Sequence, residues 1–295
     1  MYVVVMKTSK YYEVAGHCFM VEAGDADLKQ MDNYEPFRLV AMPSQELVFE
    51  LTISEGLLPV YTEEWRQEDE GQEIICGRTT EGHAVFEFIW NGTKAGWLIC
   101  RDRYQKGELL LTGQHRKSAI DNALMVQYAL ATANKGTALF HAAAVSHAGH
   151  CYMFLGVSGT GKSTHARLWL QHIGGTELVN DDNPVVRLHD DGQPIAYGSP
   201  WSGKTPCYRN ISYPLGAIVT LSQAPYNRIH RLNGIEAYIP LMESISGMRW
   251  DAEIADGLHL TEHTMVQQLP IWHLECLPDA EAAKLCWETV KTERG

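Results

Sequence analysis

Eight consecutive residues at positions 156–163 carry the clearest chemical signal in the sequence. They are Gly-Val-Ser-Gly-Thr-Gly-Lys-Ser and match the phosphate-binding pattern G-x-x-x-x-G-K-[ST] in full. Glycines in such a loop let backbone N–H groups face phosphate oxygens, and the positive end of the following helix adds to the attraction. We therefore predict that this loop, between a strand at 151–155 and a helix at 162–172, binds a nucleoside triphosphate.

The side chains around this loop have distinct predicted roles. The Lys162 ammonium would neutralise the β- and γ-phosphates, and the Ser163 hydroxyl would ligate Mg²⁺ beside them. ATP and Mg²⁺ are the cofactors expected on this basis. The residues predicted to contact the nucleotide are Gly156, Ser158, Gly159, Thr160, Gly161, Lys162, Ser163 and Thr164.

Two adjacent carboxylates, Asp181 and Asp182, follow a short apolar run at 177–179, only 19 and 20 residues after Lys162. Two carboxylates beside a metal-bound phosphate can divide the work. One can hold Mg²⁺ while the other takes a proton from an attacking hydroxyl. The residues themselves leave open which carboxylate has which role.

Two basic residues follow in a segment rich in Gly and Pro. Lys204 lies in the loop 198–206, and Arg209 comes five residues later. A flexible turn could bring such side chains over a phosphate, so both are predicted to contact the γ-phosphate or the acceptor, with simple solvation as the alternative. The 13 histidines are dispersed and show no metal-binding spacing, so we predict no transition-metal site.

The elements that position these residues differ between the two halves of the chain. Before Gly113, apolar residues alternate over short runs separated by turns such as Asn91-Gly92, which is typical of antiparallel strands and hairpins. The acidic segment 63–73 is predicted to be a solvated loop, with docking of a basic peptide as the alternative. The predicted strands are residues 2–6, 46–53, 74–78, 84–90, 95–99 and 108–112.

The apolar pattern changes to a helical period near Ser118, in an Ala-rich segment that ends before Gly136. Strands are predicted beyond it at 138–146, 151–155, 177–179, 215–221 and 271–277, and helices at 162–172, 234–246, 251–268 and from Pro278 to about 292. The sequence thus predicts an α+β protein of two domains. A β-rich domain spans 1–115, and an ATP-binding domain with a mixed sheet and flanking helices spans 116–295. The main boundary lies between Gly113 and Thr137, and the linking helix could belong to either domain.

The composition limits the classes of partner. The chain has 295 residues and a formal net charge of −12, which argues against nucleic acid. Since no apolar run approaches the roughly 18 residues needed to span a bilayer, we expect no membrane partner. Seven cysteines without a C-x-x-C pair, and a start without a basic segment, predict a cytoplasmic protein. Formation of a homo-oligomer is left open.

Three segments of the second half together resemble HPr kinase/phosphorylase and its relatives, a superfamily that also contains ATP-dependent phosphoenolpyruvate carboxykinase (PEPCK). The segments are Phe140-His141-Ala142-Ala143-Ala144-Val145, the phosphate loop with its neighbours at 154–164, and Leu178-Val179-Asn180-Asp181-Asp182. The resemblance covers roughly residues 139–288. It includes a tail at 274–279 of the sort seen in HPr-kinase-like proteins of peptide-modification clusters, and it does not extend to the region before residue 113.

This resemblance implies a fold and a set of roles. The implied fold is an HPr kinase/PEPCK-like P-loop catalytic core. At matching positions, Asp181 is the family's general base, Asp182 is the acid on the metal side, and His141 lies near the catalytic acid. Arg209 is similar to a phosphate-binding arginine of the carboxykinases, displaced by one residue. Asn180 replaces a small residue of the family, a departure expected to matter little.

The implied function is a kinase that transfers the γ-phosphoryl group of Mg-ATP to a serine-type hydroxyl on a protein, peptide or small molecule. A PEPCK-like enzyme is disfavoured because such enzymes are usually much longer chains. A non-catalytic nucleotide-binding regulatory protein could dispense with the Asp pair and with His141, so their presence favours the enzyme. The region before Gly113 is expected to select the acceptor, with a domain that only buries one face of the catalytic core as the alternative.

Overall fold

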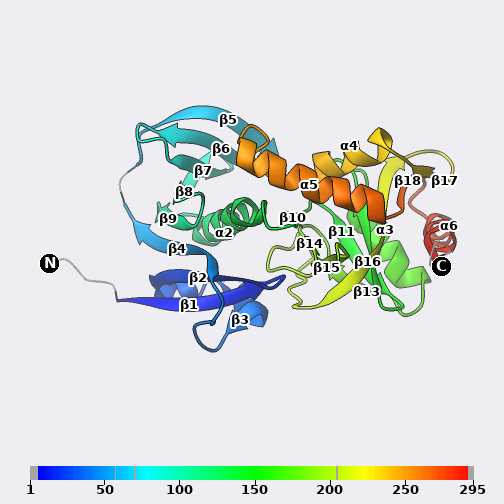
Figure 1. Ribbon diagram of the computed structural model, residues 1–295, viewed down its shortest axis with the longest axis horizontal. Coiled ribbons are helices and arrows are strands. Elements are labelled where there is room, and N and C mark those ends of the chain that lie inside the picture. Colours follow the sequence, from blue (N-terminus) through cyan, green and yellow to red (C-terminus); the bar gives the residue numbers. More distant parts are fainter. Residues whose placement is uncertain (1–5, 57, 70, 204, 292–295) are drawn as a thin grey trace. The chain divides into compact units, whose positions relative to one another are not determined.

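The computed structural model describes residues 6–56, 58–69, 71–203 and 205–291, and the chain divides into two compact units, Met1–Thr132 and Ala133–Gly295 (Figure 1). Each unit contains a large sheet and helices, so the predicted α+β class is confirmed at this level. Within the described residues, no helix has both the length and the hydropathy that crossing a membrane requires.

Unit 1 is built on a nine-stranded sheet with the order β3-β1-β2-β4-β9-β8-β7-β6-β5. The predicted hairpin at Asn91-Gly92 is confirmed: both residues have positive φ (45° and 73°), as a two-residue turn between twisted strands requires. The strands are β1 (Lys7–Val14), β2 (His17–Gly24), β3 (Arg38–Leu39), β4 (Leu47–Glu55), β5 (Tyr61–Asp69), β6 (Gln72–Thr79), β7 (Ala84–Trp90), β8 (Thr93–Arg101) and β9 (Lys106–Leu111).

Helix α2 (Arg116–Thr132) packs against β4, β8 and β9 of this sheet. Its Tyr128 hydroxyl donates to the Val14 carbonyl at 3.0 Å, and the Tyr128 ring lies edge-on to Phe19. The boundary between the units therefore follows this helix and does not precede it at residue 116, because the helix buries its apolar face in unit 1. Two short helices, α1 (Asp25–Leu28) and η1 (Asp32–Phe37), complete the unit.

Two parts of unit 1 correct the sequence-based expectation. The acidic segment is not a loop, because β5 and β6 pair along it as a hairpin. Arg66 forms ion pairs with Glu63 and Glu73, which offsets the repulsion among the carboxylates. Strands β1 and β2 were not predicted, and β2 is buried on both faces, so its residues do not alternate in polarity. The strand predicted at 2–6 lies almost wholly outside the described residues.

Unit 2 contains a second sheet in which β12, β16 and β18 run parallel. The strand order is β10-β14-β15-β16-β12-β11-β13, with β18 also on β16 and β17 on β18. The strands β14, β15 and β17 were not predicted. The bounds are β10 (Thr137–Leu139), β11 (Ala143–His147), β12 (His150–Leu155), β13 (Glu177–Asn180), β14 (Val185–Leu188), β15 (Pro194–Tyr197), β16 (Ser212–Gln223), β17 (Arg228–Leu232) and β18 (Ile271–Cys276).

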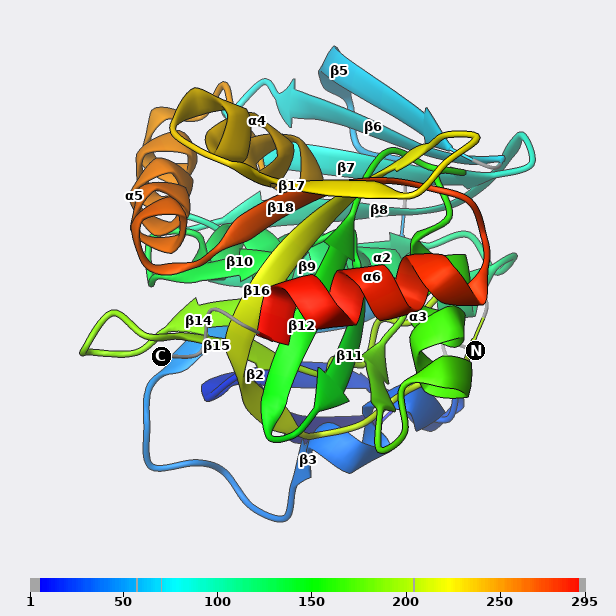
Figure 2. The ribbon, with the colours of Figure 1, turned by 90° about the vertical axis from the view of Figure 1, so that its right-hand side faces the viewer.

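The helices α3 (Lys162–His172) and α6 (Ala280–Val290) lie side by side over this sheet (Figure 2). Trp169 of α3 and Cys286 of α6 share a buried cluster with Phe154 of β12 and Val219 of β16. The remaining helices are α4 (Ile235–Ser244) and α5 (Ala252–Gln268). Because β12 and α3 are both anchored in this core, the loop that connects them is fixed at its two ends.

Candidate phosphoryl-transfer site

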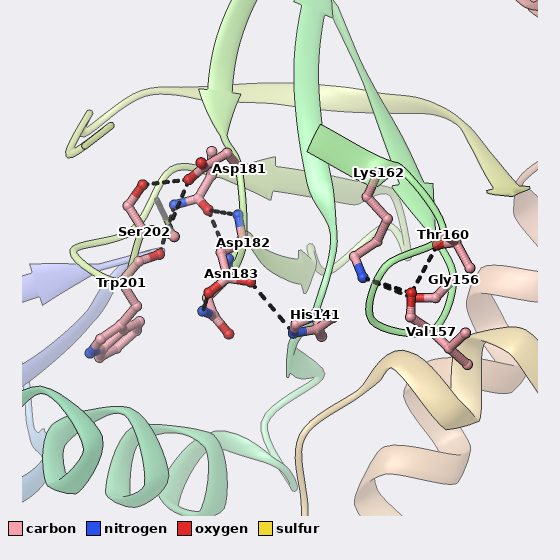
Figure 3. Close-up of polar contacts among 12 residues, drawn as sticks. His141, Gly156, Val157, Thr160, Lys162, Asp181, Asp182, Asn183, Trp201 and Ser202 are labelled. Atoms are coloured by element: carbon pink, nitrogen blue, oxygen red, sulfur yellow. Dashed lines mark hydrogen bonds and ion pairs between the residues drawn. The ribbon is translucent and has the colours of Figure 1, made fainter. Parts of the chain in front are cut away.

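The phosphate loop, residues 156–163, runs from the end of β12 into the first turn of α3, as predicted (Figure 3). Gly156, Gly159 and Gly161 have φ values of 148°, 82° and 106°, a backbone conformation that residues with a side chain rarely adopt. A Cβ atom at Gly156 would lie 2.6 Å from Thr160 Oγ1, whereas a Cβ at Gly159 would meet nothing within 4 Å. The backbone at Gly159 therefore has room for a close approach by a ligand.

Hydrogen bonds within the loop hold its lysine in place. Lys162 Nζ donates to the carbonyl oxygens of Gly156, at 2.8 Å, and Val157, at 3.4 Å. The Thr160 hydroxyl donates to the Val157 carbonyl at 2.8 Å. The Lys162 side chain is buried, whereas Ser163, in the first turn of α3, is exposed. The ammonium group thus lies inside the curve of the loop, and the Ser163 hydroxyl is open to a ligand.

The acidic turn, residues 180–183, joins β13 to β14 and is shaped by the side chain of Asn180. Its Oδ1 accepts hydrogen bonds from the backbone N–H groups two and three residues later, at 2.9 and 2.8 Å. Its Nδ2 donates to Ser199 Oγ at 3.1 Å and to the Trp201 carbonyl at 3.0 Å. Since these four bonds use both amide protons and both lone pairs of a fully buried side chain, the turn has a defined conformation.

The first carboxylate of the turn, Asp181, is covered by the loop at 198–206, called the covering loop below. Ser202 Oγ lies 2.6 Å from Asp181 Oδ1, and the Gly203 N–H donates to the same oxygen at 2.9 Å. The Thr205 N–H donates to the other carboxylate oxygen at 3.0 Å. Three donors of one loop therefore converge on Asp181, which is buried.

The second carboxylate, Asp182, faces His141. The Phe140 N–H donates to the Pro184 carbonyl at 3.0 Å, and the Ala142 N–H donates to the Asp182 carbonyl at 2.8 Å. These bonds continue the ladders of β10 with β14 and of β11 with β13 across the acidic turn. The ladder places His141 Nδ1 3.5 Å from Asp182 Oδ1, so the predicted neighbourhood of His141 and the acidic pair is confirmed.

The charges around Asp182 act in opposite directions. Burial raises the pKa of the Asp182 carboxyl, and the charge of Asp181 raises it further, whereas the charges of His141 and Lys162 lower it. The Asn183 amide also lowers it by donating to Asp182 Oδ2 at 2.8 Å. Burial is the largest of these effects on the pKa of Asp182, and the charge of Lys162 is one of the smaller ones.

The two predicted basic residues are not both placed beside this pair. The Arg209 guanidinium donates to the Leu178 carbonyl at 2.7 Å and forms an ion pair with Glu177 at 2.6 Å. Both partners lie at the start of β13, whereas the acidic turn follows its end. These contacts attach Arg209 to the first residues of β13. They do not support the predicted contact between Arg209 and a phosphate. Lys204 lies outside the described residues, so its role stays a prediction.

The sequence-based interpretation missed the residues that position the acidic turn. The expectation that Asn180 matters little is wrong, because its amide organises the turn and attaches it to the covering loop. An Asn that follows a strand often accepts from backbone N–H groups two residues on, and that signal was available in the sequence. Ser199 and Ser202 carry no comparable local signal, because their bonds reach back 19 and 21 residues.

A metal site made of protein side chains alone would bring several His, Cys, Asp or Glu residues together. Within the part of the chain that the structure describes, no three or more His, Cys, Asp or Glu side chains lie together in such a group. Comparison of the chain with protein-family models and with curated protein sequences finds no match. The functional interpretation therefore depends on the geometry of the phosphate loop and the acidic turn.

Proposed function

We propose that the chain is a Mg-ATP-dependent kinase that transfers the γ-phosphoryl group to a serine-type hydroxyl. The observation that carries the proposal is the contact between Ser202 Oγ and Asp181 Oδ1, 2.6 Å long, in the unit that contains the phosphate loop. A general base must lie about 2.6–3.2 Å from the oxygen whose proton it takes. The Asp181 carboxylate thus lies within hydrogen-bond distance of a hydroxyl group of the acceptor's chemical type. The Thr205 carbonyl, also 2.6 Å from Ser202 Oγ, is a second acceptor for the single proton of that hydroxyl.

In the proposed step, the acceptor hydroxyl replaces Ser202 beside Asp181. The acceptor oxygen forms a bond to the γ-phosphorus while the bond from that phosphorus to the β–γ bridging oxygen breaks, and ADP leaves. The hydroxyl proton passes to the Asp181 carboxylate. Lys162 and the backbone N–H groups of the phosphate loop stabilise the negative charge on the phosphate oxygens.

The residues present fit a magnesium ion. Mg²⁺ prefers oxygen ligands and binds through one or two protein groups together with phosphate oxygens. The exposed Ser163 hydroxyl and the Asp182 carboxylate, whose side chain is 32% exposed, offer such oxygens. When bound there, the ion would offset part of the phosphate charge. His141 would hold the Asp182 carboxylate in place.

The proposal includes the finer fold assignment, an HPr kinase/PEPCK-like arrangement of unit 2. It is supported by the order of three neighbouring strands, β12, β11 and β13. The phosphate loop follows β12, His141 precedes β11 by two residues, and the acidic turn begins at the end of β13. The three segments that carry the resemblance therefore lie on adjacent strands of one sheet.

Transfer of label from γ-labelled ATP tests this function. Purified full-length protein is incubated with free serine, small alcohols and serine-containing peptides, and labelled products are separated and identified. We expect label on a hydroxyl of at least one acceptor class and none with Lys162→Ala. If ATP binds but is neither transferred nor hydrolysed with any acceptor, the chain is a nucleotide-binding regulatory protein and the kinase proposal is wrong.

A further inference from the structure

Strand β5 forms one edge of the sheet of unit 1. The described residues of this nine-residue strand pair with β6 on one side, and the strand order ends there. In an edge strand, the backbone N–H and C=O groups that point away from the sheet are open to another chain. Residues 62–68 are also exposed, so the strand is accessible along most of its length.

The edge is long and carries apolar side chains. Proteins commonly protect an exposed edge with charged side chains, Pro or a bulge. Strand β5 has a register shift between Glu63 and Trp65 and mostly acidic charged side chains, which oppose pairing with a chain of like charge, and no Pro lies within it. The Trp65 side chain is 41% exposed, and just before the strand Val60 and Leu58 are 80% and 60% exposed. These side chains are available to pack on a chain that pairs with the edge.

The charge of the edge selects the kind of chain that can pair with it. Residues 61–79 contain six acidic and two basic side chains. Glu63 and Glu64 form ion pairs with arginines of the hairpin, and Glu68 adds a further exposed carboxylate. Like charges placed opposite each other destabilise a sheet, so two copies of β5 would repel. A segment rich in Lys or Arg would gain attraction.

We infer that β5 binds an extended polypeptide segment with several Lys or Arg residues, which adds to the sheet as a further strand. Backbone hydrogen bonds would supply affinity, and the glutamates would supply selectivity for the basic side chains. The last step of this inference rests on the proposed kinase function: the segment that binds β5 belongs to the acceptor. The acceptor is then a peptide or protein and not a small molecule.

A synthetic peptide tests the inference on the full-length protein. The probe is fluorescein-labelled Lys-Val-Lys-Val-Lys-Val-Lys-Gly-Ser, and its binding is measured by fluorescence anisotropy. A second peptide is methylated at every backbone nitrogen of its Lys-Val repeat, which removes the donors along both of its edges. We expect the first peptide to bind and the methylated peptide to bind at least about ten-fold more weakly, since several strand-pairing hydrogen bonds are lost.

Charge reversal on β5 provides the matched protein variants. The double variant Glu64→Lys/Glu68→Lys should bind the unmethylated peptide about ten-fold more weakly, because each exposed ion pair contributes up to about 1 kcal/mol. The control Glu81→Lys reverses a side chain that is 77% exposed in the turn between β6 and β7, and it should leave the affinity unchanged. Thermal melts of all variants confirm that they are folded.

Three results would overturn the inference: no binding of the unmethylated peptide, equal binding of the methylated peptide, or equal binding by the double variant. If the wild-type protein forms dimers and the double variant does not, the chain that pairs with β5 is a second copy of this protein and not a basic segment. Label transfer from ATP to the serine of the same peptide is scored separately. The protein could bind this peptide without phosphorylating it and still phosphorylate another acceptor. That result would support β5 as a docking strand and would contradict the inference that the docked segment belongs to the acceptor.

Discussion

The phosphate loop and the acidic turn belong to the same unit but are held by different kinds of hydrogen bond. In the phosphate loop, Lys162 and Thr160 donate to carbonyl oxygens at most six residues away. In the acidic turn, Asn180 and Asp181 are bound by a loop that lies 19 to 24 residues further along the chain. The phosphate loop is thus held mainly by bonds within a short stretch of chain, with one further bond from Gln223 to the Gly159 carbonyl, whereas the acidic turn is held by two distant segments.

This difference has consequences for mutation. Because the lysine of the phosphate loop bonds to its own loop and the loop is anchored by β12 and α3, a change there should alter ligand binding more than stability. The acidic turn depends on buried polar contacts between distant segments, and a buried polar group left without a partner costs free energy. Loss of the Asn180 side chain, which makes four of these contacts, should therefore lower stability first and, through it, activity.

The largest expected loss of stability comes from Asn180→Ala. The substitution leaves two backbone N–H groups of the turn, together with Ser199 and the Trp201 carbonyl, without their bonds to this side chain. Ser199 and the Trp201 carbonyl keep their bond to each other, so the two backbone N–H groups are the ones left unsatisfied. At about 1–3 kcal/mol for each, we expect the free energy of unfolding of unit 2 to fall by about 2–6 kcal/mol. Calorimetry measures this loss, and equal melting temperatures would show that the turn is held by other contacts.

The substitution Lys162→Ala should separate binding from stability. Loss of a charged donor to phosphate removes about 1.5–3 kcal/mol, which is roughly a ten-fold to 10²-fold loss of ATP affinity. Isothermal titration calorimetry with Mg-ATP measures that loss, while the melting temperature of the free protein should change less than in Asn180→Ala. Equal ATP affinity in wild type and variant would reduce the phosphate loop to a simple turn.

Substitutions of two glycines, one in the covering loop and one in the phosphate loop, should have smaller effects on stability. A Cβ at Gly198 in the covering loop would lie 2.0 Å from the Arg209 carbonyl oxygen, so Gly198→Ala must displace backbone. We expect a cost of about 2 kcal/mol, within the range for overpacked sites. Gly159→Ala in the phosphate loop meets no neighbouring atom and should cost about 1 kcal/mol through its positive φ alone. Thermal melts rank the two, and the reverse order would contradict this account.

The smallest expected effect is the pH dependence introduced by Asp182. Burial is the main cause that raises the pKa of Asp182 in the folded protein above its ordinary value of 3.8. The protonated carboxyl therefore contributes to stability below pH 3.8, and this contribution is lost as the pH rises through the raised pKa. The Asp182→Asn variant stays neutral. It should gain stability relative to wild type as the pH rises from about 4 to 7, and melts across that range test the sign.

The sequence predicted the phosphate loop better than it predicted the surroundings of the acidic turn. The phosphate loop, its strand and its helix were predicted from a motif of eight residues, because the bonds of Lys162 and Thr160 that shape the motif are local. One distant contact, from the Gln223 amide to the Gly159 carbonyl at 3.1 Å, was not predicted. The positions of Asp181 and Asp182 after a strand were predicted too. Their different surroundings were not, because these depend on Ser202, whose distance from the turn is set by the fold of strands β14 and β15 between them.

The edge strand β5 illustrates a second reason for error. Its carboxylates indicated a solvated loop, because the sequence pattern does not show that Arg66 lies beside Glu73 across the hairpin. The side of the domain boundary on which the helix at 116–132 lies was left open for a similar reason. Its apolar face was recognisable, but the partner of that face depends on contacts such as the hydrogen bond from Tyr128 to the Val14 carbonyl, more than a hundred residues earlier.

In the proposed kinase, the phosphate loop binds ATP and Asp181 takes the proton, and the variant Asp181→Asn separates these two roles. Mg-ATP affinity and label transfer are measured on the same folded preparation, with Lys162→Ala in parallel. The account predicts that Asp181→Asn keeps its ATP affinity and loses at least about 10²-fold in turnover, the contribution of a general base. Turnover close to that of the wild type, with ATP affinity unchanged, would contradict it.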